Sequence, residues 1–214
     1  MRIRTMLVGV TALVACASPA RAQTPATAEE TARAFFAALD GRRWDEAAGY
    51  VLPAAARRER DLDISMRIAR LETMAKGQRS GNFTVAGSGV VDPEKLRRFG
   101  STPVRSLRGV STLAQAAALA PEVYMARTME MAMTRFPGSS AAPPRHPFLG
   151  IVVENDSVAH ALYREQGGVL RYGDPAAAEV LELRRSGGRW YVLLGMTLLT
   201  VASMHFDDEF PKRP

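Results

Sequence analysis

The chain has 214 residues, 47% of them hydrophobic, and its 28 Lys and Arg residues against 22 Asp and Glu give a formal charge of +6. This length suffices for one ordinary domain with a full core, and the single cysteine excludes an internal disulfide and a cysteine-based metal site. Part of the positive charge lies in the N-terminal segment, and the remainder is too small to indicate nucleic acid as a partner.

The N-terminal segment has the three parts of a secretory signal: basic residues, a short apolar stretch and then small residues. Cleavage after Ala22 removes three of the basic residues and lowers the formal charge to +3. Cleavage before Cys16 instead leaves a lipid anchor on that cysteine. We favour the first site, because a lipid on Cys16 leaves only about ten residues of tether before the first predicted helix.

We therefore expect residues 1–22 to be a signal peptide. The mature chain is then exported to the bacterial periplasm or secreted, with a membrane-anchored lipoprotein as the alternative. No later stretch has the roughly 18 uncharged apolar residues that a membrane-spanning helix needs.

Three helices are predicted in the first part of the mature chain. Thr27 and Glu30 have the spacing of a capping box, which begins the first helix, and the pair at 40–41 ends it. A short second helix follows around Trp44. A longer third helix covers about 54–76, and its i,i+4 charge pairs are expected on the solvent side.

The segment of about 92–147 fits neither the helices before it nor the strands after it, and we interpret it as a helical insertion. It contains a Pro- and Gly-broken basic stretch, followed by predicted helices at 111–120 and 121–136. The second of these has proline in its first turn, where proline is tolerated.

The end of the chain predicts an antiparallel sheet. Asn155 with Asp156, and Gly187 with Gly188, have the composition of two-residue hairpin turns. Helices followed by such a sheet indicate one α+β domain over 27–200, with 201–214 as a tail. The four β-rich runs are 148–154, 158–165, 177–185 and 189–200.

Two phrases add a family resemblance. The stretch ETARAFFAALDGRRWDEAAGYVLPAAARR and the later AAEVLELRRSGGRWYVLLG resemble the NTF2-like (SnoaL/ketosteroid-isomerase-like) superfamily. The resemblance implies a cone in which N-terminal helices pack on a strongly curved antiparallel sheet, with a pocket between them. It assigns no catalytic residue, because members include isomerases, dehydratases, cyclases and binding domains.

His160 is the first candidate for chemistry. If Asn155 and Asp156 form the turn, Ile151 faces His160, and the imidazole is surrounded by aliphatic residues on one sheet face. Burial and a carboxylate partner would suit a general acid or base in a pocket. The other interpretation is a core histidine bonded to a backbone carbonyl or to water.

The last hairpin places Glu179 on the face that carries Trp190, so Glu179 is the carboxylate to pair with His160. The alternative is a strand-end glutamate that reaches water. Methionines on the helix at 121–136 form an apolar stripe, which is either a lid over a ligand or ordinary core packing. The residues considered for ligand contact are Tyr50, Asp63, Tyr163, Tyr191, Met129 and Met133.

The leading functional hypothesis is a non-catalytic binding domain for a small apolar ligand or a protein partner. The alternatives are a cofactor-independent lyase or isomerase, with His160 as acid/base and a tyrosine as oxyanion donor, and a structural homodimer formed through Tyr191 and Leu193. The spacing of the three histidines predicts no metal site, and no sequence motif indicates a cofactor.

Overall fold

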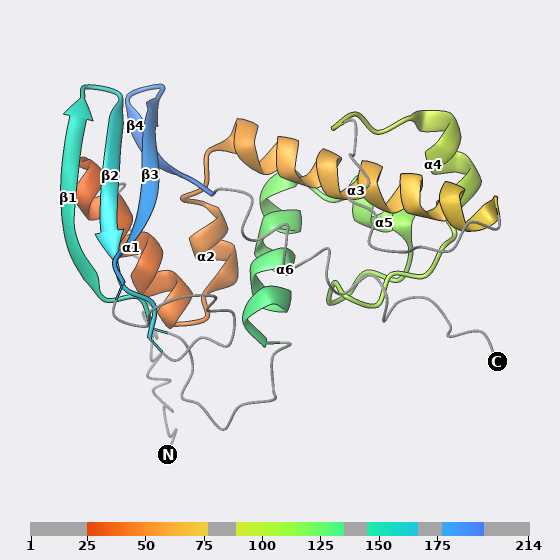
Figure 1. Cartoon of the computed structure of the whole chain (residues 1–214), viewed down its shortest axis with the longest axis horizontal. Helices are drawn as coiled ribbons and strands as arrows, with labels where there is room; N and C mark the ends of the chain where they lie inside the picture. The colour runs from red at the N-terminus through yellow and green to blue at the C-terminus, as the bar shows by residue number, and fades with distance from the viewer. Residues whose placement is uncertain (1–24, 77–88, 135–144, 167–176, 195–214) are drawn as a thin grey trace, which may run out of the picture.

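The computed structural model describes residues 25–76, 89–134, 145–166 and 177–194. Figure 1 shows an antiparallel sheet at one end of the molecule, and the long helix at 53–75 extends away from it. The predicted signal segment, Cys16 and the C-terminal tail lie outside the described residues. In chain order the elements are α1 (Ala28–Asp40), α2 (Trp44–Ala48), α3 (Pro53–Ala75), α4 (Pro93–Phe99), α5 (Leu113–Ala118), α6 (Pro121–Thr134), β1 (Phe148–Asn155), β2 (Val158–Tyr163), β3 (Glu179–Ser186) and β4 (Arg189–Leu193).

The first helix begins as the sequence predicts. The Thr27 hydroxyl accepts a hydrogen bond from the Glu30 backbone, and the Glu30 carboxylate accepts one from the Thr27 backbone, each at 3.1 Å. This reciprocal cap satisfies backbone donors that a helix start otherwise leaves without partners. Phe35 and Phe36 are buried from α1, and the helix packs against β1, β2 and β4.

The four strands are antiparallel neighbours in the order β1-β2-β3-β4. The β3–β4 turn is at Gly187 and Gly188, as predicted, and Leu183 pairs with Val192. Beyond β4, the Leu52 backbone donates to the Val192 carbonyl at 2.9 Å, so the link between α2 and α3 covers that edge of the sheet.

The predicted register of the first hairpin is wrong. His160 pairs with Val152 and not with Ile151, because the turn consists of Asp156 and Ser157, one residue later than predicted. The Asn155 side chain accepts hydrogen bonds from the Ser157 backbone and hydroxyl, both at 2.9 Å, and so fixes this turn. A bulge at Glu154 takes up the extra residue.

The strongly curved cone that the resemblance implies is not present in the described strands. Their sheet is neither closed nor strongly curled. The four strands are only five to eight residues long, and α1 is the helix that packs on them. The coarser prediction, an α+β fold with N-terminal helices on an antiparallel sheet, is confirmed.

The core consists of two clusters of buried residues. The first cluster joins α1, α2 and part of α6 to one face of the sheet, and it includes Met129, Trp190 and Val192. The second cluster lies among α3, α5 and the other side of α6, and it includes Ile64 and Tyr124. Helix α6 contributes to both clusters, so the predicted insertion is part of the main core.

Helix α4 was not predicted. Asp92 caps it by accepting hydrogen bonds from the backbone of Glu94 at 2.8 Å and of Lys95 at 3.3 Å, and Pro93 occupies its first position. Within the described ranges, no helix combines the length and apolar character that crossing a bilayer requires.

Candidate functional site

One face of the sheet is covered by α1, and the opposite face, here called the outer face, carries a row of four paired residues. This row runs Val152, His160, Glu182 and Leu193 across the four strands. Val152 is 55% exposed on this face, and Val180 in the neighbouring row is 60% exposed. The outer face therefore presents apolar side chains to solvent.

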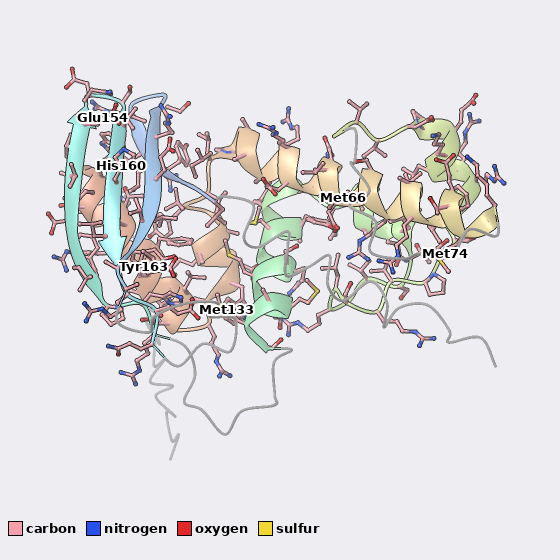
Figure 2. All side chains as sticks on the ribbon, in the orientation of Figure 1. Met66, Met74, Met133, Glu154, His160 and Tyr163 are labelled. Atoms are coloured by element: carbon pink, nitrogen blue, oxygen red, sulfur yellow. The ribbon has the colours of Figure 1, made fainter. Side chains whose placement is uncertain are left out.

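His160 lies on the outer face, and its main partner is Glu154. His160 Nε2 is 3.0 Å from Glu154 Oε2, and both side chains are partly exposed. Figure 2 shows the two residues near the turn end of β1 and β2. The one-residue shift places Val152 beside His160 in place of Ile151. The imidazole is not surrounded by aliphatic residues alone, as predicted, because Glu182 on β3 and Glu154 are also its neighbours.

Glu179 lies at the start of β3 opposite Tyr163, on the same face as Trp190, as predicted. This is the face that α1 covers. Leu181 and Leu183 follow it on the same face and are buried. Because His160 is on the outer face, the structure does not bring Glu179 and His160 together.

The remaining candidates are distributed over both faces and the core. Tyr50 packs against the first cluster, and burial raises the pKa of its hydroxyl. Tyr191 lies on the outer face with the Arg189 guanidinium 5.1 Å from its ring. Met129 is fully buried, as core packing predicts, whereas Met133 is half-buried on α6.

Asp63 is on the inside of α3, and the expectation of a solvent-side charge pair is wrong. Its carboxylate is 3.1 Å from Arg67 Nε, both side chains are buried, and the Tyr124 hydroxyl donates to the same oxygen. Arg67 also donates to the Ser106 hydroxyl at 3.3 Å. This ion pair links α3 to α6 and to the segment before α5, so its role in the structure is to join elements.

The structure brings together two residues that the sequence did not single out. Asp40, at the end of α1, accepts a hydrogen bond from the His146 backbone at 3.2 Å, and its Oδ1 is 2.7 Å from His146 Nδ1. The imidazole is stacked on Phe36, with centroids 5.8 Å apart and planes 13° apart, and it lies 5.9 Å from the Tyr163 ring. We call Phe36, Asp40, His146 and Tyr163 the His146 cluster.

No local pattern in the sequence points to this pair. Asp40 reads as a helix end and His146 as one residue of a proline-rich loop, and 106 positions separate them. Their proximity follows only from the packing of α1 against the start of β1. Tyr163, a predicted ligand contact, does belong to the cluster, and Glu179 pairs with Tyr163 at the same end of the sheet.

Among the described residues, no group of three or more His, Cys, Asp and Glu side chains is arranged to hold a metal ion. Comparison with protein-family models, with curated protein sequences and with solved structures gives no match to this chain.

Proposed function

We propose that this chain is an exported binding domain with an NTF2-like fold, and that it docks a protein partner on the outer face of its sheet. The single observation that carries the proposal is the exposure of apolar side chains there. In the described residues six large hydrophobic side chains are exposed, and four of them belong to β1 and β3. These four are Leu149, Val152, Val153 and Val180.

Exposed large apolar side chains that lie on one face of a sheet mark that face as a candidate contact site. Here Val152 and Val180 lie on the outer face itself. Leu149 and Val153 lie on the edge strand β1, and Val153, which pairs with the buried Ala159, is on the face that α1 covers. A protein surface fits this arrangement better than a small molecule, because the two exposed valines of the outer face lie on different strands, β1 and β3.

The outer face carries acidic and basic groups together, including the Arg189 guanidinium over Tyr191. Glu154 pairs with His160, and Glu182 forms an ion pair with Arg184. A face without an excess of either charge offers little attraction to nucleic acid or to a strongly charged partner. Burial of apolar area is then the main source of affinity.

The order of elements supports the NTF2-like part of the proposal, since N-terminal helices lie on one face of an antiparallel sheet. The flatter sheet is where the chain departs from the family pattern. Export is supported by the arrangement of basic, apolar and small residues at the N-terminus.

The enzymatic alternative built on His160 and Glu179 has less support. The two side chains are on opposite faces of the sheet, and His160 Nε2 is already in contact with Glu154. A second copy of the chain remains one form that the protein partner can take, because Tyr191 and Leu193 also lie on the outer face.

The test compares two variants of the chain from residue 23 onward. V152K/V180K places two charges on the outer face, and M74K places one charge on α3, where Met74 is exposed far from the sheet (Figure 2). Light scattering measures whether the chain forms a dimer. In-cell cross-linking followed by mass spectrometry identifies other proteins held by the tagged chain in the envelope.

We expect the native chain and M74K to form the same dimer or the same cross-linked complex, and V152K/V180K to lose it. Equal cross-linking by all three chains, or a strictly monomeric chain without cross-linked partners, contradicts the proposal. Circular dichroism checks that the double variant keeps its fold.

A further inference from the structure

The two nitrogens of the His146 imidazole have different surroundings. Nδ1 is 2.7 Å from Asp40 Oδ1, and the same carboxylate accepts from the His146 backbone. An ionised carboxylate only accepts hydrogen bonds, so Nδ1 carries a proton. In the neutral imidazole Nε2 is then a hydrogen-bond acceptor.

Nε2 has no hydrogen-bond partner in the part of the chain that the structure describes. The His146 side chain is only 6% exposed, yet Nε2 is not among the fully buried polar atoms that lack a partner, so it keeps some accessible surface. With so little accessible surface, this acceptor makes fewer hydrogen bonds to water than an exposed one, and it gains none from the described residues. A ligand with a hydrogen-bond donor satisfies it.

Aromatic rings flank the imidazole. Phe36 stacks on it, and Tyr163 lies 4.7 Å from Phe36 and 5.9 Å from His146, measured between ring centroids. Figure 2 shows Tyr163 at the end of β2 opposite the Glu154 turn, away from the outer-face pair. Ring faces and edges of this kind favour another aromatic ring through offset or edge contacts.

A purely structural role explains only half of the arrangement. The Asp40 carboxylate joins α1 to the start of β1 through the His146 backbone, and it needs no imidazole for that contact. The side chain adds a second contact at Nδ1, which orients the ring, and Nε2 has no hydrogen-bond partner among the described residues. Holding one ring nitrogen on a carboxylate is how proteins set the role of the other.

We propose that the His146 cluster binds a small, neutral aromatic molecule with a hydroxyl group, and that Nε2 accepts the hydrogen bond from this hydroxyl. Asp40 is the positioning residue, because it fixes the tautomer and the ring orientation. The His146 cluster shares no residue with the outer face, so its test is independent of the test of protein docking.

The test uses two probes with the same rings, one with a hydroxyl donor and one in which a methyl group replaces the hydroxyl proton. 2-Naphthol has a hydroxyl, and 2-methoxynaphthalene has the same rings without the hydroxyl proton. Long-range ¹H–¹⁵N spectra of the chain from residue 23, recorded at about pH 8, above the range in which histidine ordinarily titrates, report the tautomer and its response to each probe. H146F keeps a ring beside Phe36 but removes the acceptor, and H160A is the matched control on the outer face.

We expect the resting His146 to have its proton on Nδ1, and 2-naphthol to shift the Nε2 resonance. The methyl ether should bind about fivefold more weakly, which corresponds to one neutral hydrogen bond. H146F should bind both probes equally, and H160A should behave like the native chain.

Three results overturn the proposal: a proton on Nε2 in the resting protein, equal binding of both probes to the native chain, or no response of His146 to either probe. If H146F does not fold, the comparison of the two probes on the native chain still decides between these outcomes.

Discussion

Asp63 and Glu59 lie one helical turn apart on α3, and their carboxylates have different surroundings. Asp63 is buried against Arg67 and the Tyr124 hydroxyl. Glu59 is half-buried, and burial raises its pKa, with the nearby Asp63 charge acting in the same direction and Arg58 opposing it. A carboxylate thus joins elements of the core at one position and carries a desolvation cost at the other.

The buried pair leads to the first prediction. D63N removes the negative charge that Arg67 contacts, and leaving a buried charge without its counter-charge costs about 3 kcal/mol of unfolding free energy. The matched control is E29Q, because Glu29 and Arg33 form an exposed pair at the same i,i+4 spacing on α1. That pair is worth about 0.5 kcal/mol. Urea unfolding measures the free energy of unfolding of D63N and of E29Q. Equal losses of this free energy in the two variants would contradict a structural role for Asp63.

Glu59 leads to a prediction about pH. Its raised pKa means that the folded chain holds the proton more tightly than the unfolded chain, so the folded state loses stability as pH rises from the ordinary value of 4.5 through the raised one. E59Q removes this loss. We expect E59Q to be more stable than the native chain at neutral pH, by less than about 1 kcal/mol because solvent screens a half-buried charge.

Urea unfolding at about pH 4 and about pH 7 checks this sign. The two chains should differ at neutral pH and become alike at the acidic pH, where the native glutamate is protonated. A difference of the same size at both pH values would show that the charge of Glu59 is not its cause.

At the scale of elements, the two hairpins show what local sequence determines. Gly187 and Gly188 both have positive φ, 56° and 79°, and a two-residue turn of this type allows one register only. In the first hairpin the Asn155 side chain and the bulge at Glu154 move the turn by one residue. A one-residue shift reverses the faces, which is why the neighbours of His160 were mispredicted.

The candidate site was predictable only where it depended on such local patterns. Glu179 was predicted on the face that carries Trp190, and Tyr163 was predicted as a ligand contact. Both residues lie at the end of the sheet where His146 is found. His146 and Asp40 come together through the packing of α1 on β1. They are 106 positions apart in the sequence, and neither helical periodicity nor turn composition can predict a contact at that distance. The sequence therefore singled out His160 and not His146.

The β3–β4 turn leads to a prediction at this scale. A Cβ added at Gly187 or Gly188 meets no heavy atom within 4 Å, so a substitution there costs only backbone strain. G187N should be nearly neutral, because asparagine followed by glycine suits this turn. G187V should lose about 1–2 kcal/mol, because a left-handed backbone brings its Cβ close to the carbonyl oxygen. Thermal unfolding compares the two, and equal losses would show that packing dominates.

At the scale of the whole molecule, α6 connects two cores that would otherwise share few residues. Met125 and Met129 face the first cluster with α1, α2 and the sheet. Tyr124 faces the second cluster and also donates to Asp63 on α3. A rigid helix that is buried on both sides transmits the loss of one core to the other, so we expect one cooperative unfolding transition.

The two tryptophans make this expectation testable. Trp44 and Trp190 both belong to the first cluster or pack against it, so their fluorescence reports that core. I64A removes a fully buried side chain from the second cluster, which costs about 2–5 kcal/mol through lost burial and the cavity left behind. Because α6 couples the cores, tryptophan fluorescence and far-UV circular dichroism should shift to the same lower midpoint. M129A, in the first cluster, should give the same coincident shift. Two independently folding halves would instead leave the tryptophan-monitored midpoint of I64A at the native value, while circular dichroism shows an earlier, separate loss of helix.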